Sequence, residues 1–266
     1  MPVSRVIETL ASGMIANEKR HNTISNNLAN VNTVGFKKDI TAYTSFASVL
    51  SNEQTRRGTQ KSLSEEIYRT QVHADVPVLI DHIKTAHSQG DMRITGNNFD
   101  LALAGKGFFA IKTPEGTRYT RAGNFILNSN NELVTNSGDM VLAVDEKMRD
   151  GVPVIIHGKS VNFVNDGTVQ VDGIPTAQLR IVDFDDYEQL EKVGHSLFAY
   201  NGDARGIKRA DDITVESGYI EGSNVNAVSE LTTMIANSRH YEISGSSFKG
   251  VEQTISRAIA DLGKFK

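Results

Sequence analysis

Residues 24–37 read ISNNLANVNTVGFK, and they bring one periodic pattern to an end before another begins. Val31 is the last apolar residue of the pattern that precedes it. Asn30 and Gly35 favour a turn, because Asn and Gly accept backbone conformations that most residues avoid. Phe36 then offers a large apolar side chain for anchoring the chain as it leaves the turn. The segment therefore predicts the end of a helix and a fixed exit from it.

The residues before this turn follow a seven-residue repeat over about residues 3–31. Positions that alternate in steps of four and three carry Val3, Ile7, Leu10, Met14, Asn17, His21, Ile24, Leu28 and Val31. Most of these residues are apolar, as expected for the face of a helix that pairs with another helix. The polar residues Asn17 and His21 either fix the register of that pairing or lie where the face is solvated.

The end of the chain, from about residue 225 to residue 262, shows the same repeat. Its predicted face carries Leu231, Met234, Ser238, Tyr241, Gly245, Phe248, Glu252, Ile255, Ile259 and Leu262. Turn and N-cap residues lie just upstream, namely Gly222, Ser223, Asn224 and Asn226. We predict that the two terminal helices pair as a coiled coil, and that further copies or paralogues cover the remaining apolar surface. Periodicity alone also allows a simple intramolecular hairpin.

The middle of the chain changes to short apolar runs bounded by turn residues. We expect strands at residues 99–103, 108–112, 118–120, 124–127, 132–135, 152–157, 169–171, 177–183 and 197–200. Gly, Asn and Asp separate these runs, as in tight turns. The sequence thus predicts an α+β protein in which an all-β domain of short strands is inserted between long terminal helices.

Three parts are expected along the chain. Residues 1–36 and 222–266 form a terminal helical domain, and residues 71–221 form the β-rich middle domain. Residues 37–70 form an extended or linker segment, in which residues 41–50 are also compatible with a helix.

Composition excludes several classes of site. The chain has no cysteine, so disulfides, thiolate metal sites and cysteine nucleophiles are ruled out. The net charge of −4 argues against broad binding to nucleic acid. The first residues do not resemble a cleaved secretory signal, and no apolar run approaches the length of a membrane span.

No pattern in the sequence predicts catalysis. Metalloprotease, nucleophile-elbow and P-loop motifs are all missing. Asp183, Asp185 and Asp186 are more typical of a solvated loop than of a calcium site. The spacing of His73, His82 and His87 fits no common zinc pattern. We therefore predict no catalytic residues, no metal and no cofactor.

Three segments together resemble the flagellar rod and hook proteins. The first is ISNNLANVNTVGFK at residues 24–37, and the second is EGSNVNAVSEL at residues 221–231, which MI at 234–235 and RHYE at 239–242 follow. The third is TGNNFDLALAGKGFFAI at residues 95–111, which YTRAGNF at 119–125 follows. The resemblance covers both ends and much of the middle of the chain.

The resemblance implies a structural subunit of the bacterial flagellar basal body, located in the periplasmic rod and without catalytic activity. Such proteins polymerise helically with their paralogues, transmit torque and enclose the export channel. The expected partners are other rod proteins, copies of this chain and the flagellar type III export apparatus, with no nucleic acid and no direct membrane insertion. Chain length and the forms at residues 97–103 and 221–228 favour the proximal rod branch over the distal rod branch.

The resemblance also gives the candidate subunit-interface residues. They are Leu10, Met14, Ile24, Asn27, Leu28, Asn30, Val31, Asn32, Gly35, Phe36, Asn224, Val225, Asn226, Leu231, Met234, Ile235, Tyr241, Phe248, Ile255 and Leu262. Two alternatives stay open at this point. One is an enzyme with a site near Asp183 and Asp185, and the other is an export adaptor that does not polymerise.

Overall fold

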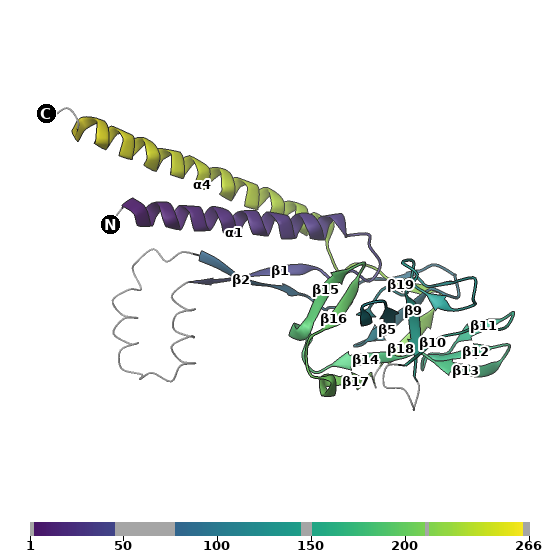
Figure 1. Cartoon of the computed structure of the whole chain (residues 1–266). Coiled ribbons are helices and arrows are strands. Elements are labelled where there is room, and N and C mark those ends of the chain that lie inside the picture. Colours follow the sequence, from purple (N-terminus) through teal and green to yellow (C-terminus); the bar gives the residue numbers. More distant parts are fainter. Residues whose placement is uncertain (1–2, 46–77, 145–150, 211–212, 263–266) are drawn as a thin grey trace. The chain divides into compact units, whose positions relative to one another are not determined.

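The computed structural model describes residues 3–45, 78–144, 151–210 and 213–262 (Figure 1). The chain divides into two compact units. The helical unit takes in Met1–Leu28, Asp39–Lys84 and Ala227–Lys266, and the β unit takes in Ala29–Lys38 and Thr85–Asn226. Each unit is thus assembled from segments that lie far apart in the sequence.

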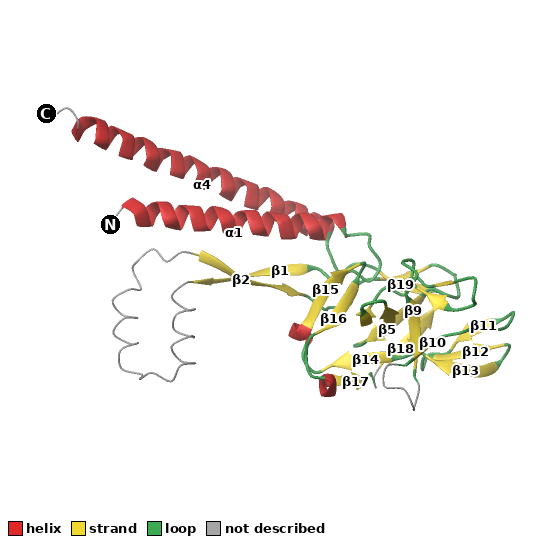
Figure 2. Cartoon of the chain, viewed as in Figure 1, coloured by secondary structure: helices red, strands yellow, loops and turns green. Residues whose placement is uncertain are grey.

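The helical unit contains two long helices and a two-stranded sheet (Figure 2). The helices are α1 (Val3–Ala29) and α4 (Ala227–Leu262), and the sheet pairs β1 (Asp39–Ser45) with β2 (Val78–Thr85). Glu230 lies in the first turn of α4, where a carboxylate is favoured by the positive end of the helix dipole. No helix in the described part of the chain is both long enough and apolar enough to cross a membrane.

The predicted coiled coil is wrong. Leu231 and Ile259 on the predicted face of α4 are 46% and 65% exposed, whereas Asn237, next to the predicted position Ser238, is 3% exposed. Coiled-coil packing requires such face residues to insert into the partner along the whole helix. Figure 1 shows α1 and α4 diverging toward their outer ends. The heptad count failed because the apolar residues of α4 are spread around the helix and do not form one stripe.

The segment after α1 begins with a strand, although the sequence of residues 41–50 is also compatible with a helix. Residues 39–45 form β1, so the helical interpretation of residues 41–45 is wrong. Thr41, Tyr43 and Thr44 favour a strand, because β-branched and aromatic side chains fit an extended backbone. The rest of the predicted linker, residues 46–70, lies outside the described residues.

The β unit consists of short antiparallel strands. In chain order they are β3 (Met92–Ile94), β4 (Leu101–Gly105), β5 (Phe108–Thr113), β6 (Gly116–Thr120), β7 (Ile126–Leu127), β8 (Leu133–Val134), β9 (Met140–Ala143), β10 (Val152–Pro153), β11 (Val161–Phe163), β12 (Thr168–Val171), β13 (Ile174–Gln178), β14 (Ile181–Phe184), β15 (Leu190–Gly194), β16 (Leu197–Tyr200), β17 (Ile207–Arg209), β18 (Ile213–Ser217) and β19 (Tyr219–Glu221). Two 3₁₀ turns, η1 (Tyr187–Gln189) and η2 (Ala204–Gly206), interrupt them.

One large sheet organises the unit. Its strand order is β15-β16-β6-β5-β9-β8-β7, with β10 paired to β9, and with β14 joining both β5 and β17. Smaller sheets are β11-β12-β13, β18-β4 and β19-β3. In the last of these, β19 lies beside β3 although more than 120 residues separate them in the sequence, with Tyr219 opposite Ile94.

The core lies on both faces of β5. Phe109 and Ile111 pack in one buried cluster, and Phe108 and Ala110 pack in a second cluster. Successive residues of a strand point to opposite faces, so this alternation places β5 between two apolar layers. The continuous apolar run FFAI at residues 108–111 follows from burial on both sides.

Each of the predicted strands overlaps an observed one, and the inserted β-rich region is confirmed. The prediction of one continuous strand at residues 177–183 is wrong, because β13 ends at Gln178 and β14 begins at Ile181. Leu179 and Arg180 lie between these two strands. The backbone N–H of Leu179 donates to the carbonyl oxygen of Gly167, and that of Arg180 donates to the carbonyl oxygen of Leu142. The chain therefore changes sheets inside one apolar run.

Candidate functional site

The β unit binds the segment that follows α1 to the segment that precedes α4. Gly35 has a φ of +66°, and its N–H donates to the carbonyl oxygen of Glu221 over 2.8 Å. A Cβ atom at Gly35 would lie 2.2 Å from the backbone nitrogen of Ala122. Both the left-handed conformation and the close approach therefore require glycine here.

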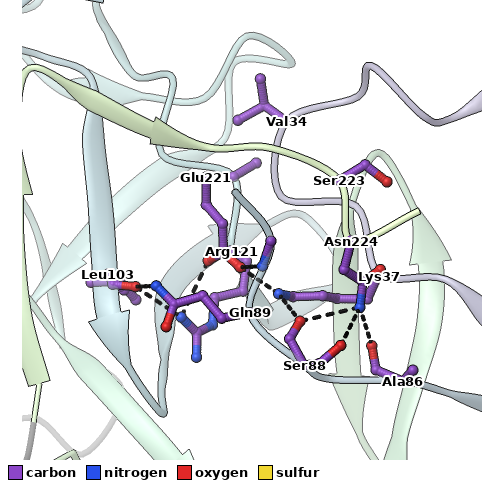
Figure 3. A network of polar contacts seen from close by, with 12 residues as sticks. Val34, Lys37, Ala86, Ser88, Gln89, Leu103, Arg121, Glu221, Ser223 and Asn224 are labelled. Carbon is purple, nitrogen blue, oxygen red and sulfur yellow. Dashed lines mark hydrogen bonds and ion pairs between the residues drawn. The ribbon is translucent and has the colours of Figure 1, made fainter. Parts of the chain in front are cut away.

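A fully buried cluster of charges lies at this crossing (Figure 3). We call Lys37, Arg121 and Glu221 the charged triad. Lys37 Nζ lies 2.5 Å from Oε1 of Glu221, and Arg121 Nη1 lies 3.3 Å from Oε2. One carboxylate thus pairs with two cations, one from the segment after α1 and one from the segment after β6.

Backbone groups add further hydrogen bonds to the charged triad, although the buried Nε of Arg121 has no hydrogen-bond partner among the described residues. Lys37 Nζ also donates to the carbonyl oxygen of Ser88, and the Arg121 guanidinium donates to those of Leu103 and Gly105. The N–H of Gly90 donates to Oε1 of Glu221. Because buried charges are stable only when paired and hydrogen-bonded, these contacts fix several loops around one point.

The triad carries one more positive than negative charge, and its burial has electrostatic consequences. Burial lowers the pKa of the Lys37 ammonium below its ordinary value, while the nearby Glu221 carboxylate opposes that shift. Burial also lowers the pKa of the Arg121 guanidinium, which Glu221 again opposes. Arginine nevertheless stays protonated in proteins, so Glu221 retains a cationic partner at any physiological pH.

Asn224 adds a second link beside the triad. Its Oδ1 accepts from the backbone N–H of Lys38 at 2.7 Å, and its Nδ2 donates to the carbonyl oxygens of Ala86 and Ser88. Among the residues predicted to supply turn and N-cap groups before α4, Asn224 directs its side chain to the backbone of residues 38, 86 and 88. Its amide thereby joins three segments of the β unit (Figure 3).

The hairpin of β15 and β16 also contacts the exit turn. Lys192 Nζ lies 4.3 Å from the centre of the Phe36 ring and donates to the carbonyl oxygen of Lys37. Ser196 Oγ donates to the carbonyl oxygen of Val34 at 3.3 Å. Phe36 is thereby buried within the β unit, as its apolar side chain predicted.

The candidate interface residues separate into two groups. Those around the turns are mostly enclosed by this chain, so their contacts here are intramolecular. Gly35, Phe36 and Val225 are buried, Asn30, Val31 and Asn224 are half-buried, and Asn32 and Asn226 are exposed.

The candidates on the helices are more accessible. Ile24 and Asn27 are buried, Leu10, Met14, Leu28, Met234, Phe248 and Ile255 are half-buried, and Leu231, Ile235 and Tyr241 are exposed. The side chain of Leu262 lies outside the described residues. Asn27 exchanges two hydrogen bonds with the backbone of Asp39, which ties the end of α1 to the start of β1.

The acidic cluster has structural partners. Asp183 Oδ1 accepts from the hydroxyl of Tyr187, Asp185 pairs with Lys208, and Asp186 caps η1. Across the residues that the structure describes, no three His, Cys, Asp or Glu side chains gather in a way that could hold a metal ion. Of the three histidines considered as ligands, His73 lies outside the described residues. His87 instead packs against the rings of Phe108, Tyr187 and Phe198.

Sequence reasoning missed the charged triad. Lys37 lies at the end of the quoted exit segment, and Glu221 begins the quoted segment before α4, but neither was assigned a role. Arg121 lies between two predicted strands and carries no local signal. A charged residue within an otherwise apolar or Gly-rich segment is the one feature that could have drawn attention to them.

Three family models match successive parts of the chain. Residues 7–37 match the flagella basal body rod protein model, and residues 102–171 match the flagellar hook protein FlgE/F/G D1 domain. Residues 216–261 match the flagellar basal body rod FlgEFG protein C-terminal model. All three residues of the charged triad thus lie within matched regions, one in each.

Whole-length relatives agree with these matches. The chain is 32% identical to the flagellar basal-body rod protein FlgG of Caulobacter vibrioides, over 94% of this chain and 97% of that protein. It is 32% identical to FlgG of Bacillus subtilis, over 87% and 89% of the two chains. It is 30% identical to the flagellar basal-body rod protein FlgF of Mesorhizobium japonicum, over 95% of each chain.

Proposed function

The chain belongs to the flagellar basal-body rod proteins, and from this premise we propose how its two units serve a structural subunit of the rod. It is a structural component of the periplasmic rod of the flagellar basal body. The helical unit supplies surface for neighbouring subunits, and the β unit holds the two chain segments that lead to the helices. Through these contacts the subunits polymerise helically, transmit torque and enclose the export channel.

Exposed apolar side chains on α4 carry this proposal. Val228 is 74% exposed and Ile235 is 57% exposed, and Leu231 and Ile243 are exposed as well. An array of large apolar residues on one helix is typical of a surface that another protein covers. Other rod proteins and further copies of this chain are the partners that family membership favours.

The candidate interface residues are assigned accordingly. Leu231, Ile235 and Tyr241 are proposed to contact neighbouring subunits directly, because they are exposed on α4. Gly35, Phe36 and Asn224 are proposed to act indirectly, by holding the exit turn through contacts inside the β unit.

Replacement of Leu231 by aspartate tests the proposed interface. A carboxylate buried against an apolar neighbour is costly, so Leu231→Asp is expected to abolish swimming and rod assembly. Leu28→Asp is expected to have the same effect. Leu231→Met keeps an apolar side chain of similar volume and is expected to leave swimming intact. Normal rods with Leu231→Asp, in a chain whose β unit remains folded, would contradict the assignment.

We propose that the chain has no catalytic activity of its own. The carboxylates at residues 183, 185 and 186 are engaged by Tyr187, Lys208 and η1, respectively. Swimming that persists after Asp183→Asn and Asp185→Asn would agree with this, and a loss of swimming by a folded, incorporated double variant would oppose it.

We further propose that the flagellar type III export apparatus carries the chain to the rod, as the family resemblance implies. Deleting the export apparatus should then keep the chain inside the cell. The alternative of a non-polymerising export adaptor predicts a chain that is never found in purified rods.

The preference for the proximal rod protein FlgF over the distal rod protein FlgG stays a prediction from the sequence. Relatives of both names match over nearly the whole chain, at 30% and 32% identity.

A further inference from the structure

A polar side chain is buried where α1 and α4 meet in the helical unit. Asn237 of α4 is 3% exposed, and its Nδ2 donates to the backbone carbonyl oxygen of Asn17 in α1 over 2.9 Å. Ala16, the residue before Asn17, is also buried, whereas Ile15 is exposed. A small residue at this level lets the backbone of α1 come close enough to accept the bond.

The contact lies at a similar distance along the two helices, measured from the end of α1 and from the start of α4. Asn17 is 12 residues before Ala29, where α1 ends, and Asn237 is 10 residues after Ala227, where α4 begins. At 1.5 Å per residue these separations are about 18 Å and about 15 Å. The helices run in opposite directions (Figure 1), so one side chain reaches the other helix only for a narrow range of relative sliding.

The bond does not satisfy the whole amide. Oδ1 of Asn237 is buried and accepts no hydrogen bond from any group in the described residues. A buried acceptor without a donor costs free energy, and leucine at this position would avoid that cost. Stability alone therefore does not explain asparagine at residue 237. In coiled coils a single buried asparagine specifies register at the expense of stability, and Asn237 is a comparable buried asparagine between two helices, although these do not form a coiled coil.

The contact also sets which face of α4 points outward. At about 100° per residue, Val228 and Ile235 lie about 180° and 160° around the helix from Asn237. Glu230, seven residues before Asn237, shares its face and is buried too. With Asn237 against α1, the apolar residues on the opposite face remain exposed.

We infer that Asn237 and the Asn17 carbonyl form a positioning contact that fixes the sliding and rotation of α4 against α1. The contact thereby determines that Val228, Leu231 and Ile235 are the residues offered to a neighbouring rod subunit. This inference rests on the proposed function for its consequence in the rod, but the contact itself is a property of the isolated chain.

Distance measurement between spin labels tests the contact in the full chain. The sequence has no cysteine, so Glu18→Cys and Arg239→Cys, both at exposed positions beside the contact, can be labelled selectively. The otherwise unchanged chain is expected to give one narrow distance distribution. Asn237→Leu is expected to broaden it or to add a peak shifted by about 5 Å, one helical turn. Asn22→Leu, the same change at an exposed position of α1, is expected to leave it unaltered.

Two results would overturn the contact: an unchanged distribution with Asn237→Leu, or a distribution that is already broad before that change. Swimming then tests its consequence, since Asn237→Leu is expected to lose rod incorporation while Asn22→Leu retains it. Normal incorporation of Asn237→Leu despite an altered distance would refute the positioning role. Absence of the unaltered chain from purified rods would instead refute the proposed function, and the distance result would still stand on its own.

Discussion

Replacing Glu221 by glutamine removes the negative charge that both cations of the charged triad share. The side chain keeps its shape, but one carboxylate oxygen becomes an NH₂ group that faces a Lys37 or Arg121 donor at a site closed to water. Two positive charges then remain buried without a counter-charge.

The expected loss in the free energy of unfolding follows from the contacts of Glu221. Removing one partner of a buried ion pair costs about 3–5 kcal/mol, because the remaining charge is uncompensated. Lys37→Met should cost less, about 1–2 kcal/mol, because Glu221 keeps Arg121 and the N–H of Gly90 as donors. The free energies of unfolding should therefore rank Glu221→Gln as clearly more destabilised than Lys37→Met.

Urea unfolding followed by tyrosine fluorescence measures these differences, since the chain has 7 tyrosines and no tryptophan. Glu115→Gln is a matched control, because Glu115 is 80% exposed and pairs with Arg118 on the surface. Surface pairs contribute little, so this control should change the free energy of unfolding by less than about 1 kcal/mol. A cost for Glu221→Gln no greater than that for Lys37→Met would refute the reasoning that Glu221 neutralises two cations.

Three further predictions concern single positions. Gly35→Ala should destabilise the β unit by about 2 kcal/mol or more in urea unfolding, because it adds a clash with Ala122 to the cost of a left-handed backbone. Gly96→Ala, with a φ of +73° and open space for a Cβ, isolates the backbone cost of about 1 kcal/mol, and equal losses at both glycines would argue against the clash. Burial and the bond to Asp183 raise the pKa of Tyr187, so absorbance titration should show one tyrosine that ionises later than the others and is missing in Tyr187→Phe. The pKa of Tyr187 is higher in the folded state than in the unfolded state. Its contribution to the free energy of unfolding is therefore fully present below the unfolded pKa, and it is lost as the pH rises from the unfolded pKa through the folded pKa. A Cβ atom at Gly245 would meet no atom within 4 Å, and alanine favours the helix over glycine by up to about 1 kcal/mol. Circular dichroism of the isolated Gly245→Ala chain should therefore show a higher helix content, and an unchanged spectrum would oppose this.

Local patterns predicted the parts of the fold that depend on neighbouring residues. The run FFAI at residues 108–111 and the flanking glycines gave a strand that the structure confirms as β5. The turn residues at 30–35 gave the end of α1 to within two residues. In both cases the backbone preference and the apolar pattern agree.

Features that depend on distant residues were not predictable in the same way. Glu221 lies 184 residues from Lys37 and 100 residues from Arg121 in the sequence, and each of the three alone is an ordinary charged residue. The heptad count placed Ser238 on the contact face of α4, whereas its neighbour Asn237 is the buried residue. A pattern of apolar residues cannot indicate that a polar side chain will make the contact.

The most direct test of the central claim is a cryo-electron microscopy reconstruction of purified basal bodies that contain this chain. We expect density for the chain in the rod, with Lys37, Arg121 and Glu221 still buried together and α4 in contact with a neighbouring subunit through Leu231 and Ile235. Rods that lack the chain, or rods in which that face of α4 touches no neighbour, would contradict the central claim.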